Sequence, residues 1–289
     1  MINGDNVQGF YNRVFYFYQC FKNHKIGTLN NLEILKVKLD VDKLELTHGS
    51  PARRLSNLFW ESLNWKNISI QLEDSLHFFD IGCGTGNYAY RYKRLTDKKF
   101  GSYRGLDHKS YDTNKEFEII IDDAENSYKY ISEDTNIVVS QSALEHVQRD
   151  LLTVNKITEA LTSQNKKFLQ IHLVPASSSI FLYLWHGWRQ YSKKNLGLIS
   201  DNLKRDFGVS TIAVPLGGFR SFFKHLKLIT FPTYFGKLLK LNKSFFSKKN
   251  IDKQITNSVS KDLDLASNFP IFWALIVFSE DITTDFLNK

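Results

Sequence analysis

The sequence predicts an α/β protein built on a doubly wound, mainly parallel sheet. Short apolar runs alternate with polar segments of helical character from residue 76 onward, and spacings of about 20 to 30 residues dominate among the first five runs. A glycine-rich segment, GCGTG at 82–86, follows the first of these runs directly. The 289 residues suffice for one large domain with insertions.

Seven strands are expected in this sheet. Each is a run of four to eight mainly apolar residues, the size of a strand buried on both faces. The expected strands are 76–81, 103–107, 117–121, 136–140, 168–174, 226–231 and 271–278. Because the fifth and sixth are separated by about 50 residues, more than one crossover helix needs, an insertion is expected between them.

Residues 1–75 are expected to form an N-terminal helical layer ahead of the domain at 76–289. Ser50 and Pro51 offer an N-cap and a first-turn proline for a helix over 52–65. Insertions are expected at about 175–225 and 236–265. The first contains the aromatic stretch IFLYLWHGWRQYSKKN at 180–195, interpreted as a cap over the active site. The second contains six lysines against one aspartate over 236–253, which indicates either a solvated face or a contact with anionic lipid headgroups.

Composition narrows the class of protein. With 42% hydrophobic and 24% charged residues, the chain has the composition of a globular protein, and its apolar runs are shorter than the roughly 20 residues of a membrane span. The first residues lack a signal-peptide pattern, which favours a cytoplasmic location.

Two cysteines, Cys20 and Cys83, fit neither a disulfide framework nor a zinc site. The net charge of +8 favours an anionic partner: a phosphate-bearing substrate, a nucleic acid or an acidic membrane surface.

The segment HFFDIGCGTGNYAYRY at 77–92 predicts a strand, a tight glycine loop and a helix. Glycine permits positive φ and a close approach of the backbone to a ligand, and the helix N-terminus favours an anionic group. A dinucleotide fingerprint would place its third glycine at position 87, where this chain has Asn87. Asp80 would repel a pyrophosphate, but it suits a ligand that carries an ammonium group, such as S-adenosylmethionine.

DIGCGTGNYA resembles the first motif of class I methyltransferases that use S-adenosylmethionine. Among these enzymes, it is similar to the type 11 and type 12 methyltransferases. The resemblance implies a Rossmann-like, seven-stranded methyltransferase sheet. It also implies that Asp107 binds the ribose hydroxyls, and that Asp123 with Ala124 binds the adenine, Asp122 being the alternative. The segment NIVVSQSALEHV at 136–147 is similar to the one that passes beneath the cofactor in this family. The cofactor residues implied are Asp80, Gly82, Cys83, Gly84, Gly86, Asp107, Asp123, Ala124 and Ser140.

The catalytic candidates are Glu145, His146 and His172. An imidazole titrates near pH ~6.5 and can accept a proton from a hydroxyl. The alternative for His146 is a hydrogen bond within a helix turn, and for His172 a satisfied position inside a strand. His186 is interpreted as a pocket wall. Relatives with a metal beside a Glu-His pair carry an acidic residue where this chain has Ser142, so no metal site is expected.

Several acceptors are compatible with this site. Methylation of nucleic-acid bases goes with an Asn or Asp followed by Pro-Pro and an aromatic residue, whereas this chain reads SQSA at 140–143, so no nucleic-acid partner is expected. The segments ARRLSNLFW and LYLWHGWRQY are similar to methyltransferases of bacterial surface-polysaccharide clusters, which implies O-methylation of a saccharide hydroxyl in O-antigen-like synthesis. The alternatives are a small-molecule O- or N-methyltransferase, and a partner protein that binds the cofactor without catalysis.

Overall fold

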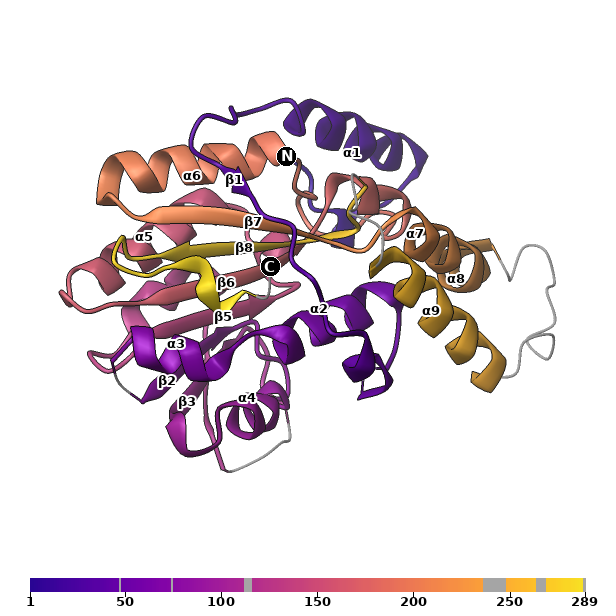
Figure 1. Cartoon of the computed structure of the whole chain (residues 1–289). Coiled ribbons are helices and arrows are strands. Elements are labelled where there is room, and N and C mark those ends of the chain that lie inside the picture. The colour runs from indigo at the N-terminus through magenta and orange to yellow at the C-terminus, as the bar shows by residue number, and fades with distance from the viewer. Residues whose placement is uncertain (47, 74, 112–115, 236–247, 264–268, 288–289) are drawn as a thin grey trace.

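The computed structural model is centred on one mixed sheet of eight strands, in the order β1-β7-β8-β6-β5-β2-β3-β4 (Figure 1). The structure describes residues 1–46, 48–73, 75–111, 116–235, 248–263 and 269–287. The strands are β1 (Glu33–Ile34), β2 (Leu76–Ile81), β3 (Phe100–Asp107), β4 (Glu118–Ile121), β5 (Ile137–Gln141), β6 (Leu169–Pro175), β7 (Ser210–Leu216) and β8 (Phe272–Phe278). Strands β2 to β6 pair in parallel, so their carboxyl ends meet at one edge, and β8 is antiparallel to β6 and β7.

Helices cover both faces of the sheet (Figure 1). One layer contains α2, α3 and α4, and the opposite layer contains α5 and α6. Helices α7, α8 and α9 extend from the side of α2, and α1 lies near the N-terminus beyond α6. The helices are α1 (Phe10–Asn23), α2 (Pro51–Ser62), α3 (Trp65–Gln71), α4 (Tyr88–Thr96), α5 (Asp150–Thr162), α6 (Lys193–Phe207), α7 (Phe219–His225), α8 (Phe231–Phe235) and α9 (Lys248–Leu263), with short 3₁₀ turns between several of them.

Six of the seven expected strands are confirmed, and the one expected at 226–231 is wrong. Residues Leu226–Thr230 form a turn of π-helix that joins α7 to α8. A short apolar run does not distinguish a strand from a buried helical turn, and here Leu228 packs inward from the helix. The true strand is β7, part of the expected insertion at 175–225, which also contains the regular crossover helix α6. Residues 236–247 of the second expected insertion lie outside the described residues.

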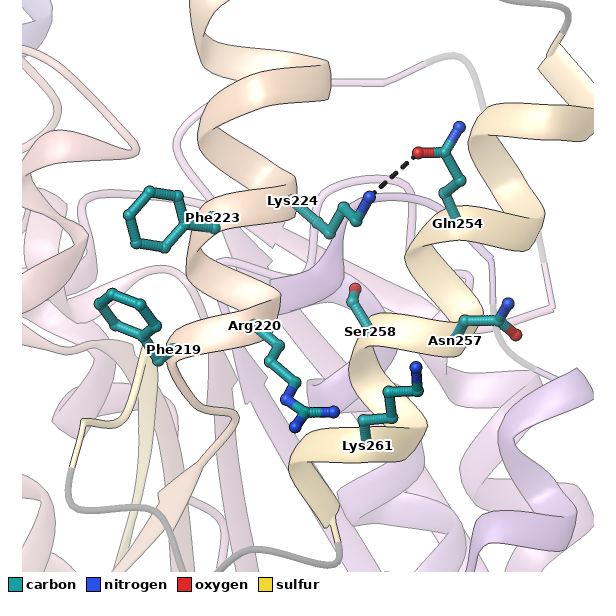
Figure 2. Close-up of a pocket in the computed structure, with 8 residues that line it drawn as sticks. All are labelled: Phe219, Arg220, Phe223, Lys224, Gln254, Asn257, Ser258 and Lys261. Carbon is teal, nitrogen blue, oxygen red and sulfur yellow. Dashed lines mark hydrogen bonds between the residues drawn. The ribbon is translucent and has the colours of Figure 1, made fainter.

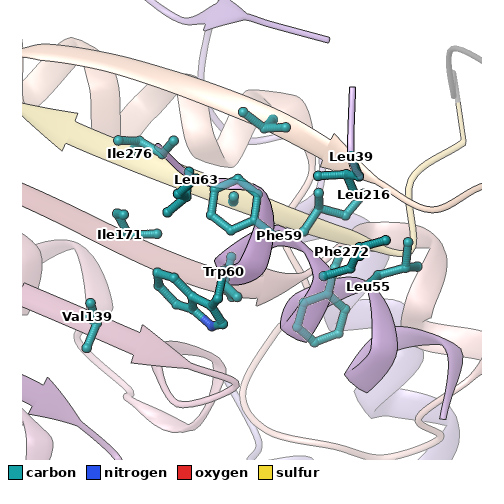
Figure 3. Packing of buried hydrophobic residues seen from close by; sticks show 14 of the residues in the cluster. Leu39, Leu55, Phe59, Trp60, Leu63, Val139, Ile171, Leu216, Phe272 and Ile276 are labelled. Carbon is teal, nitrogen blue, oxygen red and sulfur yellow. The ribbon is translucent and has the colours of Figure 1, made fainter. Parts of the chain in front are cut away.

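Helix α2 is buried along almost its whole length. Ser50 caps it by accepting a hydrogen bond from the Arg53 amide, and Pro51 occupies its first turn, as the sequence predicts. All of its residues except Arg53 are buried. Figure 3 shows side chains of α2 and of neighbouring strands packed together; those labelled include Leu55, Phe59, Trp60, Leu63, Val139, Ile171, Leu216, Phe272 and Ile276. The Trp60 indole donates to the Gln141 side chain (2.9 Å), so this helix fixes a polar group at the carboxyl end of β5.

In the described part of the chain, no helix combines the length and apolarity needed to cross a membrane.

Candidate active site

The glycine loop joins the end of β2 to α4. Gly82, Gly84 and Gly86 all have positive φ, at 73°, 56° and 71°, which L side chains adopt only with strain. A Cβ on Gly82 would lie 2.5 Å from the Cβ of Ala143, whereas a Cβ on Gly84 would have no heavy atom within 4 Å. Gly82 therefore allows the loop after β5 to pack closely, and Gly84 borders open space.

A cavity of about 560 Å³ opens beside this loop, a size typical of small-molecule sites. Asp107 lies at its wall, at the end of β3, and its two carboxylate oxygens accept hydrogen bonds from the Gly84 amide (2.8 Å) and the Lys109 amide (3.2 Å). Gly82 lines the same cavity. The carboxylate is thus held at the carboxyl edge of the sheet, where open α/β sheets bind their ligands.

Asp123 and Ala124 also line this cavity, after β4. Asp123 accepts a hydrogen bond from the Glu125 amide (2.8 Å) and so caps the 3₁₀ turn Ala124–Tyr130. The neighbouring Asp122 does not line the cavity; its carboxylate accepts hydrogen bonds from the Tyr130 hydroxyl (2.7 Å) and from the Asn126 side chain (3.1 Å). Of the two adjacent aspartates, Asp123 is the one placed for a ligand.

Asp80 and Cys83 lie behind the loop rather than at the cavity wall. Asp80 is 3% exposed, and it accepts a hydrogen bond from the Tyr103 hydroxyl (2.8 Å). Burial raises the pKa of Asp80 to about 7, helped by the charge of Asp107 and opposed by Tyr103. Burial likewise raises the pKa of the Cys83 thiol, which packs against Gly105. Asp80 thus braces β2 against β3 instead of presenting a free carboxylate.

Ser140 and His172 are enclosed within the sheet, contrary to the roles expected for them. Both are fully buried, and the Ser140 hydroxyl lies 2.9 Å from His172 Nδ1. The other ring nitrogen is 3.3 Å from Gln170 Oε1. Burial lowers the pKa of His172 to about 4. With both ring nitrogens in hydrogen-bond contact and no exposure, His172 does not line this cavity and serves as a core residue.

His146 is joined to the N-terminal segment by Asp5. Asp5 Oδ2 lies 2.7 Å from His146 Nδ1, and Oδ1 accepts a hydrogen bond from the Gly187 amide (3.1 Å). Burial opposes ionisation of both groups, but their hydrogen bonds and mutual charge outweigh it, so the pKa of Asp5 is lowered and the pKa of His146 is raised. Because an ionised Asp5 only accepts hydrogen bonds, Nδ1 of His146 carries the proton and Nε2 is the nitrogen that exchanges one.

His186 and Glu145 complete this cluster. His186 Nδ1 is 3.3 Å from Asp5 Oδ1, and its Nε2 is 3.9 Å from Glu145 Oε1. Glu145 is fully buried; it accepts a hydrogen bond from Ser142 (2.8 Å), while its Oε2 has no partner among the described residues. Ligand atoms of Glu145, His146 and His186 lie within 4.8 Å of one another, so these three could hold a cation although no metal site was expected from the sequence.

A second cavity, of about 340 Å³, adjoins the first. Ser142 and His146 line both cavities. Ser142 has a φ of 57°, a strained value for a residue other than glycine that recurs at functional sites. The other walls of the second cavity come from α2, β5, β8 and the aromatic loop after β6; they include Arg53, Gln141, Tyr183, His186 and Phe272. The two cavities thus meet at His146.

The functional residues that sequence reasoning missed lie far from the motifs. Asp5 is 141 positions from His146 and 182 from Gly187, and no local pattern marks it. Asn3 and Asn6 line the first cavity with it. Arg53 and Tyr183 belong to the segments ARRLSNLFW and LYLWHGWRQY, but only the tertiary fold brings the two residues to the wall of one cavity.

No family model matches the chain, and no curated protein is detectably similar to it in sequence. Three solved structures with a similar fold are methyltransferases or related enzymes. An S-adenosylmethionine-dependent methyltransferase from Archaeoglobus fulgidus is 18% identical, with a TM-score of 0.45 over 81% of this chain and 97% of its own. A cyclopropane-fatty-acyl-phospholipid synthase-like protein from Lactobacillus casei is 10% identical, with a TM-score of 0.45 over 83% and 100%. A plantazolicin methyltransferase in complex with a triazolic analogue and SAH is 15% identical, with a TM-score of 0.40 over 84% and 95%. At these values we base the function on the site itself.

Proposed function

We propose that this protein is an S-adenosylmethionine-dependent methyltransferase that methylates a saccharide hydroxyl, in synthesis of a surface polysaccharide of the O-antigen kind. The observation that carries the proposal is the meeting of two cavities at His146. The first cavity has the glycine loop, Asp107 and Asp123 in the order and at the strand ends that a nucleoside-bearing cofactor requires. The second has the groups that a polar acceptor requires.

The residues at the first cavity fit this cofactor. Asp107 offers carboxylate oxygens to ribose hydroxyls, and such charge-assisted hydrogen bonds are among the stronger ones in proteins. The open space beside Gly84 would be filled by a side chain at that position. Asp123 and Ala124 lie at the same wall, where the adenine would bind. When bound, the cofactor supplies an activated methyl group.

The protein's own task is to align the acceptor, exclude water and remove a proton. Asp5 holds the proton on His146 Nδ1, which leaves Nε2 to take the proton of the acceptor hydroxyl as the oxygen is methylated. Asn3 and Asp5 form part of the cavity wall, and the Gly4 amide donates to the Gly187 carbonyl (2.6 Å) to hold this N-terminal segment in place. The His186 ring packs edge-on against the His146 ring, with centroids 4.5 Å apart, and Ser142 holds the buried Glu145 next to it in the sequence.

The second cavity supports a saccharide acceptor through its mixture of groups. Arg53, Gln141 and His186 offer polar atoms to hydroxyl groups, while Tyr183 and Phe272 offer apolar faces. This combination suits a sugar ring better than it suits a purely apolar acceptor. The surface-polysaccharide role itself is supported by the resemblance of ARRLSNLFW and LYLWHGWRQY to enzymes of such clusters.

Calorimetric titration of the purified chain with S-adenosylmethionine, and separately with NADH, tests the cofactor. We expect micromolar binding of the former alone; binding of NADH instead would overturn the proposal. Transfer of label from methyl-labelled S-adenosylmethionine to a glycan fraction then tests the acceptor. Label transfer to small phenols or amines alone would identify a small-molecule enzyme, and cofactor binding with no turnover on any acceptor would indicate a non-catalytic partner.

A further inference from the structure

Helix α1 carries an exposed aromatic surface that the proposed catalytic site does not use. Its outer face consists of apolar and aromatic side chains at helical spacing, with exposures between 46% and 87%. These are Phe10, Tyr11, Val14, Phe15, Tyr18 and Phe21. Exposed apolar surfaces of this extent mark contacts with a partner or a membrane. We call these six residues the aromatic face of α1.

The opposite face of α1 is fixed to the protein. Tyr16 and Cys20 are fully buried, and the Tyr16 hydroxyl donates to the His186 carbonyl (2.6 Å). Phe17 packs against Trp185, with ring centroids 5.9 Å apart, and the Arg13 guanidinium lies 4.6 Å from the centroid of the Trp185 ring. The aromatic face is therefore presented outward by a helix whose inner face is anchored beside the acceptor cavity.

The helices that follow β7 also carry exposed aromatic side chains, and one of them contacts Trp185. Trp185 contacts Tyr234 of α8, with ring centroids 6.0 Å apart, and the Tyr234 hydroxyl donates to the Leu184 carbonyl (3.2 Å). Along the same helical run, Phe219 and Phe223 of α7 are also exposed, at 59% and 49%. Trp185 thus connects α1 to α8, and α7 carries further exposed aromatic side chains.

Basic groups accompany these aromatic side chains. Figure 2 shows a groove between α7 and α9, with Phe219 and Phe223 on one side of α7 and Arg220, Lys224 and Lys261 along the groove. Lys224 donates to the Gln254 side chain (3.0 Å). None of the eight residues that line the groove is acidic, and its volume is about 450 Å³. The groove thus offers positive charge without a compensating carboxylate on its walls.

The distribution of charge along the sequence extends this pattern. No acidic residue lies between Asp5 and Glu33, where three basic residues occur. None lies between Asp206 and Asp252, where eight occur. These two acid-free segments contain α1, α7 and α8. An amphipathic aromatic helix with basic neighbours has the chemistry of a helix that lies in the interface of an anionic bilayer.

We infer that the aromatic face of α1, together with Arg220, Lys224 and Lys261, docks this protein onto an anionic membrane surface. Aromatic rings suit the headgroup level of a bilayer, and the cations are attracted to anionic lipids. A protein partner would match the aromatic face equally well, but it would not by itself account for the absence of acidic residues from the segments that contain α1, α7 and α8. The inference is independent of the methyl transfer proposed above.

Flotation of the full chain with vesicles tests the inference. Vesicles of equal parts phosphatidylglycerol and phosphatidylcholine are compared with phosphatidylcholine alone, at low and high salt. We expect binding only to the anionic vesicles, weakened by salt. The triple variant Phe10→Ser, Tyr11→Ser, Tyr18→Ser is expected to lose at least about tenfold in vesicle affinity, because it removes the apolar area that enters the interface. Each substitution Arg220→Gln, Lys224→Gln or Lys261→Gln is expected to cost about fivefold.

The matched control removes exposed apolar residues elsewhere. Ile70 of α3 and Leu152 of α5 are 60% and 43% exposed. The double variant Ile70→Ser, Leu152→Ser is expected to bind vesicles as the wild-type chain does. Equal losses in both sets of variants, or no binding to anionic vesicles, would overturn the inference. So would sedimentation showing a dimer that the triple variant converts to monomer, because the face would then be a protein interface. Circular dichroism and cofactor binding of each variant separate loss of docking from loss of fold.

Discussion

Replacing Asp107 by asparagine tests the assignment of the first cavity most directly. The substitution keeps the shape of the side chain and one acceptor oxygen, but it removes the negative charge and the second carboxylate oxygen. In the structure both oxygens already accept backbone hydrogen bonds, from the Gly84 amide (2.8 Å) and the Lys109 amide (3.2 Å). The ribose hydroxyls would use the lone pairs that remain, and Oδ2 is the freer oxygen because His108 Nδ1 also lies 3.1 Å from Oδ1.

The expected loss of binding free energy follows from the number of hydrogen bonds to the ribose that the substitution weakens. A hydrogen bond to a charged group contributes about 1.5 to 3 kcal/mol, against about 1 kcal/mol for a neutral one. Two ribose bonds weakened or lost by Asp107→Asn would cost about 2 to 3 kcal/mol, which is about a 30- to 150-fold rise in the Kd for S-adenosylmethionine. The free energy of unfolding should fall by only about 1 kcal/mol, because one backbone amide loses its acceptor.

Calorimetric titration measures this change, with Asp122→Asn as the control. Asp122 carries the same charge nearby, but its carboxylate is bonded to Tyr130 and Asn126 and does not line the cavity. We expect Asp122→Asn to bind the cofactor almost as the wild-type chain does. If the two variants had equal Kd values, Asp107 would not contact the cofactor and the reasoning from the strand end would be refuted.

Three further predictions follow from the same contacts. Gly82→Ala should lower the free energy of unfolding by about 3 kcal/mol, because the new side chain both strains a positive φ and overlaps Ala143. Gly84→Ala should lower it by only about 1 kcal/mol, because it strains φ alone. Equal urea midpoints for the two variants would contradict this prediction. In an NMR titration of the wild-type chain, the pKa of His146 should lie above 6.5, so the rate of methyl transfer should increase as pH rises through that pKa. Asp5→Asn should lower the pKa of His146; an unchanged pKa would show that Asp5 does not hold the proton on this imidazole. Burial lowers the pKa of His172 to about 4, so the unfolded chain takes up a proton before the folded one, and the free energy of unfolding should fall by up to about 3 kcal/mol between pH 6.5 and 4; His172→Asn should lack that part of the pH dependence in chemical denaturation.

The parallel centre of the fold was predictable because its signal is local. Strands β2, β5 and β6 are buried almost throughout, so they read as mainly apolar runs with polar helices between them. Strand β7 escaped prediction because it contains Pro215, which cannot donate to a neighbouring strand. The structure tolerates this proline because β1 pairs only with Ile212 and Ala213, so no β1 residue opposes Pro215.

The site was predictable where chemistry coincides with a strand end. Asp107 ends β3 and Asp123 follows β4, and the parallel sheet brings these strand ends together. The same reasoning was wrong for Ser140 and His172, because their side chains are buried against the sheet and lie within hydrogen-bond distance of each other. Sequence position does not reveal which face a strand residue takes when both faces are buried. Asp5 could not be found at all, since its partners come from distant segments.

The connection between α1 and the acceptor cavity leads to a last prediction. Tyr16, on the inner face of α1, holds the His186 carbonyl, and His186 lines the acceptor cavity but not the first cavity. A membrane that binds the aromatic face of α1 therefore contacts a helix whose other side supports the acceptor cavity. If the acceptor is carried on a lipid, Phe10→Ser with Tyr11→Ser should raise the KM for the vesicle-borne acceptor and leave the Kd for S-adenosylmethionine unchanged. A parallel loss of cofactor affinity would show that α1 supports the whole site, and its aromatic face would then be explained by folding rather than by delivery of the acceptor.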